Sequence, residues 1–378
     1  MTTPNPRILV LWADRDSTNL GLRALAEGTE SIVERRWPNA ELTFHTQDSD
    51  DTPLSKRSVL RDIFRSRGPI KRELSRYDAI LDTGAGDSFT DIYGLRRLIL
   101  MAYVQRVAAR LGVPIILMPQ TIGPFDSRLG RMIATRSLQR ATRVFARDPV
   151  SLEYAKQLGR QSTSESTDLV FALPRADHTG GVERDVVINV SGLLWHENPH
   201  VDYESYRRSV TALIDGLLQR DRRVSLLAHV LDSTVTDNDV PAVRELGRHF
   251  GDSVEILVPD SLTSVRGILA TADVVVGARM HACLNSLSVG TPAIPWAYSR
   301  KFAPLMDALG WSLHVDLRTT ADPARDTLTL IDSTDFTVAR TGCCNSLSGP
   351  IRGWTNSAPP SVTQSSVRHD RCGPSSRR

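Results

Sequence analysis

The chain has 378 residues, of which 40% are hydrophobic and 24% charged, a balance typical of a globular protein with room for two domains. Its formal net charge of +3 is small, and basic residues are scattered rather than clustered before the C-terminal tail, which argues against a nucleic-acid partner. Ile8–Trp12 is too short for a signal peptide, and no stretch approaches the length of a membrane span, so we expect a cytoplasmic protein. The four cysteines, three of them in the tail, suggest no disulfide framework.

The first half of the chain alternates short apolar runs with amphipathic stretches. This pattern predicts strands at Ile8–Leu11, Glu41–Phe44, Asp78–Asp82, Val113–Met118 and Arg143–Ala146, and helices at Asn19–Arg35 and Leu95–Leu111. Gly112 stands where a glycine commonly ends a helix. Repetition of strand, helix and strand at this spacing favours a parallel sheet with helices on both faces.

The segment Leu173–Asp185, with proline, glycines and charges, is typical of a linker to a second unit of the same kind. There the pattern predicts strands at Val186–Val190, Val224–His229, Val254–Leu257, Asp273–Gly277 and Ala293–Trp296, and helices at Tyr203–Gln219, Val240–Phe250, Ser261–Thr271, His281–Val289 and Phe302–Leu309. We therefore expect an α/β fold with two doubly wound, Rossmann-like domains, over residues 1–176 and 184–332. Ligands of such sheets bind beyond the carboxyl ends of the strands, which predicts a cleft between the domains.

Residues 333–378 are rich in Ser, Thr, Pro, Gly and Arg and show neither helical nor strand periodicity. This composition favours a disordered tail. A shifted reading frame is the alternative, because the composition changes abruptly and cysteines appear. Sequencing of the 3′ end of the gene would decide between the two.

The strongest functional motif is DVVVGARMHA at residues 273–282, in which a β-branched strand is followed by a helix. Arg279 and His281 stand at this junction, where backbone N–H groups and the helix dipole favour anions. A guanidinium group binds phosphate or carboxylate with a planar fork, and an imidazole can transfer a proton near neutral pH. The plainer alternative is a surface arginine beside a core histidine.

Other polar residues also follow predicted strands. Gly84 and Gly86 permit a tight turn and close approach of a ligand, Asp87 could orient a sugar hydroxyl, and Gln120 lies on a stiff Pro- and Gly-containing loop, although each segment could equally be a structural turn. The remaining candidates are Arg147, unless it merely pairs with Asp148 or another carboxylate, His229 at a strand end, and Lys301 as a phosphate contact unless it is simply solvated. No spacing typical of a metal site occurs.

Seven segments in this order resemble the polysaccharide pyruvyl transferase family, over roughly Arg7 to Trp311. They are the Asn19–Arg23 loop, TGAGDSFTDIYG, MPQTIGPF, ARDPVSLEYAKQLG, TDLVFAL, AHVLD and VVVGARMHACLNSLSVGTPAIPWAYSRK. The resemblance implies a fold similar to B-type glycosyltransferases and an enzyme that moves a pyruvyl group from phosphoenolpyruvate to a saccharide, usually as a ketal across two hydroxyls. It implies no cofactor besides this donor, and it leaves open whether the acceptor is a polymer of the cell wall, an exopolysaccharide or a lipid-linked glycan.

The resemblance also implies roles for individual residues. Arg279 and His281 match an Arg-x-His motif near the donor, Arg147 matches an Arg-Asp motif that binds it, and His229 matches a histidine at a strand end facing the cleft. The N-terminal domain would then be the acceptor side and the C-terminal domain the donor side. His281 is the first candidate for the acid that protonates the methylene carbon, and His229 is the alternate.

The chain departs from the family pattern in three places. An alanine, Ala85, stands where the family more often has a third glycine; Leu22 and Arg23 replace an acidic pair; and the unpatterned tail replaces helical sequence. Two alternatives stay open: a nucleotide-sugar-dependent B-type glycosyltransferase on the same architecture and, because of the missing acidic pair and the unusual tail, a non-catalytic or decayed relative that only binds saccharides or partners.

Overall fold

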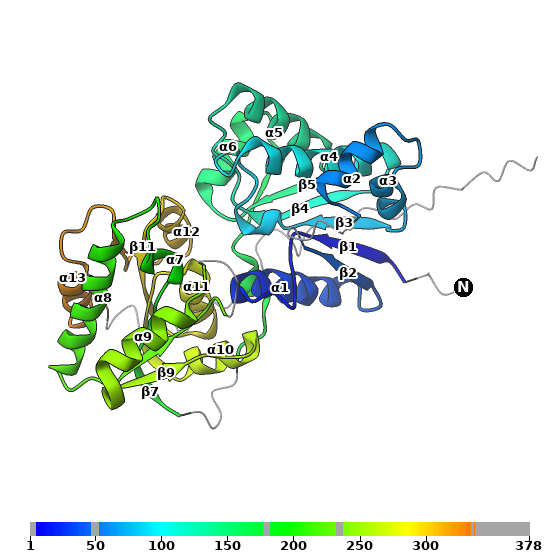
Figure 1. Cartoon of the computed structure of the whole chain (residues 1–378). Coiled ribbons are helices and arrows are strands. Elements are labelled where there is room, and N and C mark those ends of the chain that lie inside the picture. Colours follow the sequence, from blue (N-terminus) through cyan, green and yellow to red (C-terminus); the bar gives the residue numbers. More distant parts are fainter. Residues whose placement is uncertain (1–4, 47–52, 177–181, 232–236, 334–335, 337–378) are drawn as a thin grey trace, which may run out of the picture.

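The computed structural model describes residues 5–46, 53–176, 182–231, 237–333 and 336. Within these ranges the chain forms two lobes, each built on a six-stranded parallel sheet covered by helices (Figure 1). The predicted α/β class, with two Rossmann-like units, is confirmed.

The first sheet has the order β2-β1-β3-β4-β5-β6. Its strands are β1 (Arg7–Leu11), β2 (Glu41–His45), β3 (Ala79–Asp82), β4 (Ile115–Gln120), β5 (Arg143–Ala146) and β6 (Ser164–Glu165). The chain adds β2 on one side of β1 and the later strands on the other. This reversal between β1 and β3 is the kind of switch point at which ligands of such sheets bind.

Helices cover both faces of the first sheet. They are α1 (Leu20–Arg36), α2 (Lys56–Ile63), α3 (Pro69–Leu74), α4 (Leu95–Leu111), α5 (Arg128–Arg140) and α6 (Pro149–Gln157), with short 3₁₀ turns η1 (Gly84–Gly86) and η2 (Leu169–Ala172). Asn19 caps α1 by accepting the Gly21 N–H, and α4 ends at Gly112, which has a φ of +75° that glycine adopts without strain.

The second sheet has the order β12-β11-β10-β7-β8-β9. Its strands are β7 (Arg184–Asn189), β8 (Val224–Leu227), β9 (Val254–Leu257), β10 (Ala272–Gly277), β11 (Ala293–Ala297) and β12 (Val315–Asp316). Here the order reverses between β7 and β10. The β-branched runs on these central strands are buried, as expected for strands covered on both faces.

The helices of the second lobe are α7 (Gly192–Trp195), α8 (Tyr203–Leu218), α9 (Val240–Phe250), α10 (Leu262–Ala270), α11 (Met280–Val289), α12 (Phe302–Ala308) and α13 (Pro323–Ile331), with the 3₁₀ turn η3 (Gly251–Ser253). Of the predicted tail, only Ser333 and Phe336 lie within the described residues, and Phe336 is buried in the core of this lobe. The rest of the tail prediction, and residues 177–181 of the predicted linker, lie outside them.

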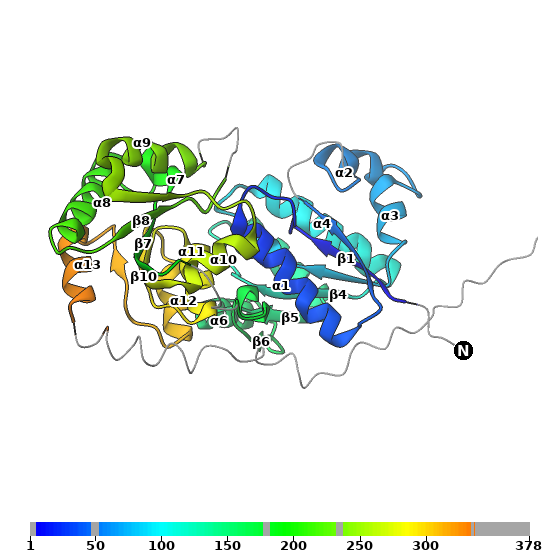
Figure 2. The same cartoon turned by 90° about the horizontal axis from the view of Figure 1, so that it is seen from below.

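The lobes meet along α1, which packs against α10 and α11 of the second lobe (Figure 2). A backbone bridge joins them as well, because Leu20 N–H donates to the carbonyl of His229 at 3.2 Å and Leu231 N–H donates to that of Thr18 at 2.8 Å. The loops after β1 and β8 are thereby held side by side. Residues at the carboxyl ends of the two sheets therefore share one site.

Candidate active site

A cavity of about 220 Å³ lies between the lobes at the carboxyl ends of both sheets. The first lobe lines it with Asn19, Gly21, Leu22, Ala85, Gly86, Asp87 and Arg147, and the second with Leu193, His229, Val230, Asp237, Arg279, Met280, His281 and Tyr298. Six of the nine predicted site residues are thus brought together. The other three, Gly84, Gln120 and Lys301, do not line the cavity but lie next to residues that do.

Arg147 follows β5 and is almost completely buried, with 1% of its surface exposed. Its Nη1 donates to Oδ2 of Asp168 and its Nε to Oγ1 of Thr121, both at 2.9 Å. Its Nη2 has no hydrogen-bond partner among the described residues. Arg147 does pair with a carboxylate, but with Asp168 rather than Asp148, and it keeps one buried donor for a ligand.

Arg279 caps the start of α11 and is held by two carboxylates. Its Nη2 and Nε donate to Oδ1 of Asp239 at 2.7 and 3.1 Å, and its Nη1 lies 2.6 Å from Oδ1 of Asp237. Its backbone N–H donates to Oδ1 of Asn189 at the end of β7. The two neighbouring carboxylates keep the pKa of Arg279 above its ordinary value despite burial. The guanidinium is therefore fixed in the cavity wall with its charge already balanced.

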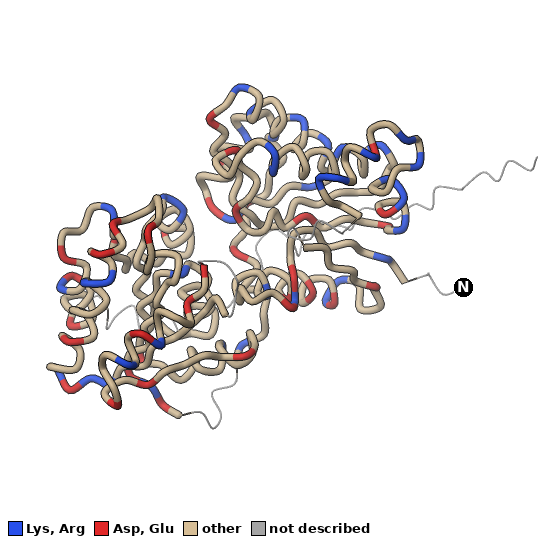
Figure 3. Tube along the Cα trace, in the orientation of Figure 1, with Lys and Arg blue, Asp and Glu red and all other residues tan. Residues whose placement is uncertain are grey.

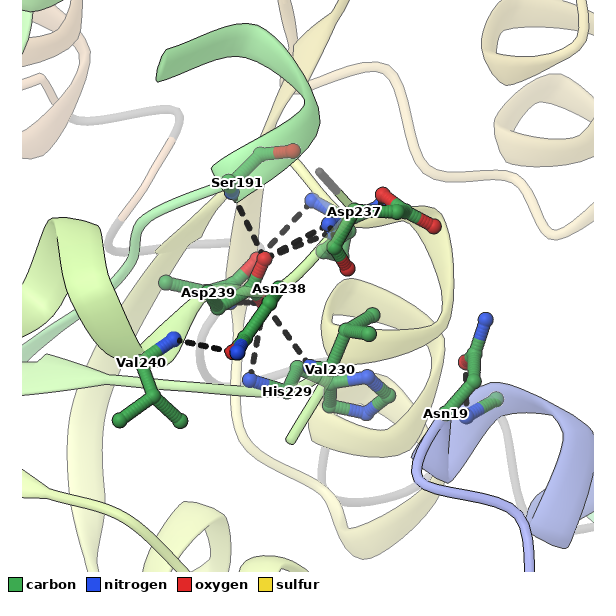
Figure 4. A network of polar contacts seen from close by, with 12 residues as sticks. Asn19, Ser191, His229, Val230, Asp237, Asn238, Asp239 and Val240 are labelled. Atoms are coloured by element: carbon green, nitrogen blue, oxygen red, sulfur yellow. Dashed lines mark hydrogen bonds and ion pairs between the residues drawn. The ribbon is translucent and has the colours of Figure 1, made fainter. Parts of the chain in front are cut away.

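Asp239 organises this half of the site (Figure 4). Besides Arg279, its carboxylate accepts the backbone N–H groups of Gly192 at 2.7 Å, His229 at 3.0 Å and Val230 at 2.9 Å. It is fully buried, whereas the Asp237 side chain is 39% exposed. Asp239 thus fixes the loops after β7, β8 and β10 relative to one another. Asp237 instead pairs with Arg279, in the loop after β10.

His281 lies in the first turn of α11 and faces the opposite lobe. Its Nε2 is 3.8 Å from Oδ1 of Asp168 and has no hydrogen-bond partner among the described residues. Burial is the main cause that lowers the pKa of His281, and the Asp168 carboxylate opposes it. A Cβ added at Gly21 would come within 2.8 Å of the His281 Nδ1, so the ring packs directly on the start of α1. His281 and Arg147 share Asp168 as a neighbour.

His229 is more enclosed than His281. Burial lowers its pKa to about 3, and the charges of the neighbouring His281 and Arg279 act in the same direction. Its Nε2 lies 3.5 Å from the side-chain Nδ2 of Asn285, which can only donate, so Nε2 is the acceptor. His229 is therefore neutral at physiological pH and holds no proton on the nitrogen nearest to Asn285.

The glycine loop after β3 makes the floor of the cavity. Gly84, Ala85 and Gly86 all have positive φ, at +57°, +48° and +79°. The left-handed conformation of Ala85 costs about 1–2 kcal/mol, because its Cβ is crowded there. A third glycine would adopt it without this cost. A Cβ at Gly84 would clash with Oε1 of Gln120, whose Nε2 donates to the Asp82 carbonyl at 2.9 Å. Gln120 is buried beneath the loop and supports it rather than facing the cavity.

Asp87 connects the loop to the second lobe. Its carboxylate pairs with the Lys301 ammonium, which also contacts the Tyr93 hydroxyl and lies 4.9 Å from the centre of the Tyr93 ring. Burial alone would raise the pKa of Asp87, but the Lys301 charge lowers it overall. Lys301 thus forms an ion pair between the lobes, and Asp87 is ionised at the edge of the cavity.

Sequence reasoning missed three carboxylates, Asp168, Asp237 and Asp239. Asp168 stands in the family segment TDLVFAL and caps η2 through the Val170 N–H. Asp239 precedes α9 and looks like a helix cap in the sequence, but its side chain makes no capping bond there. The two arginine motifs were the available signal, since an arginine buried at a strand end requires an anionic partner: Arg147 is paired with Asp168, and Arg279 with Asp237 and Asp239.

No group of three or more His, Cys, Asp or Glu side chains with a metal-binding arrangement is present in the part of the chain that the structure describes. In the same residues, no helix combines the length and apolarity required to cross a bilayer.

The architecture is that of two-lobed, B-type glycosyltransferase-like proteins. Staphylococcus aureus MnaA, solved with UDP, superposes with a TM-score of 0.58 at 12% identity, over 91% of this chain and 93% of that one. UDP-GlcNAc 2-epimerase from Neisseria meningitidis, solved with UDP-GlcNAc, gives 0.53 at 9% identity, over 91% and 96%. At such low identity the likeness concerns the fold alone.

The family assignment comes from the sequence, by a match over most of the chain. The family model of polysaccharide pyruvyl transferase matches residues 19–300, so the chain belongs to this family. Among characterised proteins, it is 24% identical over 259 residues to the amylovoran biosynthesis protein AmsJ of Erwinia amylovora. The match covers 63% of this chain and spans about three fifths (61%) of the length of that relative.

Proposed function

We propose that this protein acts in polysaccharide biosynthesis by transferring the pyruvyl group of phosphoenolpyruvate to a saccharide, as a ketal across two hydroxyls. The family membership and the AmsJ relative support the role in polysaccharide synthesis. The observation that carries the chemistry is the pair of buried, unpartnered nitrogens in one cavity, Nη2 of Arg147 and Nε2 of His281. The first can bind an anion and the second can carry a proton.

Phosphoenolpyruvate presents a phosphate and a carboxylate on either side of its enol carbon. In our proposal, the free Nη2 of Arg147 donates to one of these groups, and Arg279 binds the other after its half-exposed partner Asp237 moves away. Asp239 remains bound to Arg279 and keeps the guanidinium in place. An arginine fork is suited to this task because it can hold two oxygens at once.

His281 is the general acid in this proposal. The anionic donor raises the pKa of the neighbouring imidazole, so the ring takes up a proton and passes it from Nε2 to the methylene carbon. The first sugar hydroxyl adds to the adjacent carbon, phosphate departs with the electrons of its C–O bond, and the second hydroxyl closes the ketal. Of the two hydroxyl protons released, one restores His281 and the other leaves with phosphate. The neutral, enclosed His229 is less suited to the role.

The test is to offer purified protein phosphoenolpyruvate and, separately, nucleotide sugars, each with a panel of saccharide acceptors. We expect phosphate release that depends on phosphoenolpyruvate, and a product whose mass has increased by one pyruvyl ketal. Nucleotide release from a nucleotide sugar would instead support the glycosyltransferase alternative. A folded protein that turns over neither donor would support the non-catalytic alternative.

A further inference from the structure

A second concave site lies on the outside of the first lobe, away from the cavity between the lobes. It is a groove of about 370 Å³ between α4 and α5. Its lining combines apolar side chains and a tyrosine with three arginines: Ile99, Tyr103, Arg106, Ile133, Arg136 and Arg140 are among its residues. The groove and the exposed side chains of α4 and α5 around it are called the arginine face below.

The arginine face carries concentrated positive charge. Helices α4 and α5 contain four arginines each and no Asp or Glu, although the chain as a whole is nearly balanced at +3 (Figure 3). Arg106, Arg136 and Arg140 are exposed and form no ion pair with any carboxylate of the described residues. Burial first, and then the neighbouring guanidinium groups, lower the pKa of Arg140. The cluster therefore repels itself and would gain from an anionic partner.

The same face also exposes large apolar side chains. Ile99 on α4 and Leu129 and Met132 on α5 are 43%, 44% and 42% exposed. Next to α4, helix α2 and the residue after it add Leu60, Ile63 and Phe64, of which Phe64 is 85% exposed. Helices α2, α4 and α5 lie along one side of the first lobe in Figure 1. Apolar groups placed among unpaired arginines are typical of surfaces that enter the interface of a membrane.

Charge decides between the possible occupants. A second copy of the chain would bring two sets of arginines face to face, which like-charge repulsion opposes. A soluble polyanion would satisfy the arginines but leave Leu129 and Met132 in water. A bilayer with acidic phospholipids offers phosphates to the arginines and an apolar layer to the other side chains.

We propose that the arginine face docks on the surface of a membrane containing acidic phospholipids, with a lipid phosphate in the groove between Arg106, Arg136 and Arg140. This proposal does not depend on the reaction in the cavity, because α4 and α5 lie on the opposite face of the first sheet from α1 (Figure 1) and the groove shares no residue with the site between the lobes.

The test measures co-sedimentation of the full chain with phosphatidylcholine vesicles, with and without phosphatidylglycerol. We expect binding only to the acidic vesicles, weakening as added salt shortens the Debye length. The variant Arg136→Glu/Arg140→Glu should lower the partition coefficient at least about 25-fold, since each arginine near an anionic surface contributes about fivefold. The matched control, Arg244→Glu/Arg248→Glu on α9, changes the net charge equally and should bind like the wild type.

A third variant, Leu129→Ser/Met132→Ser, separates a membrane from a soluble polyanion. We expect it to lose binding to acidic vesicles while keeping its affinity for polyphosphate. Circular dichroism and thermal unfolding establish that every variant is folded. Equal binding to both kinds of vesicle, equal loss in the control variant, or unchanged vesicle binding after the serine substitutions would overturn the proposal.

Discussion

Two carboxylates hold Arg279, and we expect their removal to have different consequences: loss of the Asp237 charge should tighten donor binding, and loss of the Asp239 charge should destabilise the fold. Asp237 lies 2.6 Å from Nη1 but its side chain is 39% exposed, so its pair with Arg279 is partly screened by water. We place its strength at about 1–2 kcal/mol, between an exposed ion pair and a buried hydrogen bond to a charged group. If the donor must displace Asp237, this free energy is subtracted from donor binding.

Asp237→Asn should therefore lower the KM for phosphoenolpyruvate by about 5- to 30-fold, since each 1.4 kcal/mol corresponds to a factor of ten. The turnover number should stay near the wild-type value, and loss of the pair should lower the thermal midpoint by only about 2–8 °C. The assay is phosphate release at a fixed acceptor concentration over a series of donor concentrations, with direct titration of the donor to separate affinity from turnover.

Asp239→Asn is the contrasting variant. Asp239 is buried and holds Arg279 together with three backbone N–H groups, so loss of its charge should cost about 3–5 kcal/mol of folding free energy and lower the thermal midpoint. An unchanged or increased KM in a stable Asp237→Asn protein would refute the reasoning and remove Arg279 from the donor site.

Four further outcomes test the rest of the site. His281→Ala should reduce turnover by about 10²–10⁴-fold with the fold intact, and the control His249→Ala, on the exposed surface, should not. Arg147→Lys should raise the donor KM at least about tenfold, because a lysine keeps the charge but lacks the planar fork that reaches Thr121, Asp168 and a ligand at once. An unchanged KM would exclude Arg147 from the donor site. Gly21→Ala should slow turnover by displacing the His281 ring and should also lower stability, since the new Cβ would come within 2.8 Å of its Nδ1, and a wild-type rate would show that this packing is unimportant. The pKa of His229 is about 3 in the folded protein and near 6.5 when unfolded, so the unfolded state binds more protons between these values. The free energy of unfolding should therefore fall by about 1.5 kcal/mol between pH 6.5 and 5, as measured by urea unfolding. His229→Asn should reduce this loss.

The sheets and the position of the main motif could be predicted because their signals are local. The β-branched run that becomes β10 and the glycine that ends α11, Gly290 with a φ of +93°, place Arg279 and His281 at a strand–helix junction without knowledge of the rest of the fold. Parallel sheets also bury both faces of their strands, which makes the apolar runs continuous and easy to recognise.

Helix α5 illustrates what the sequence concealed. It was not predicted, because an outer face of four arginines leaves only a narrow apolar stripe, in which Ala134 and Leu138 are buried. Its exposed Leu129 and Met132 blur the period further. The pattern that hid the helix is the same distribution of arginines and apolar side chains from which the membrane proposal is argued.

The site itself depends on contacts between residues far apart in the chain. Asp168 pairs with Arg147 within the first lobe and meets His281 only when the lobes come together, and no spacing in the sequence indicates that one carboxylate serves both. Gln120 is predicted to bind a ligand because it is a polar residue at the end of a strand. In the structure the glycine loop covers it, and its side chain donates to the Asp82 carbonyl instead.

In the proposed reaction, the pairing of charges in the cavity would couple donor binding to protonation of the acid. Each cation already has a carboxylate neighbour: Arg147 has Asp168, Arg279 has Asp237 and Asp239, and Lys301 has Asp87. An anionic donor therefore does not enter a cavity of excess positive charge. Its binding must displace a carboxylate from one of these cations or be accompanied by uptake of a proton. Asp237 is the exposed and replaceable partner, and His281 is the group whose pKa burial has lowered and an anion can raise. In the proposed reaction, binding of the donor therefore also protonates His281. The charged imidazole then exists mainly when an enol carbon is present to receive its proton.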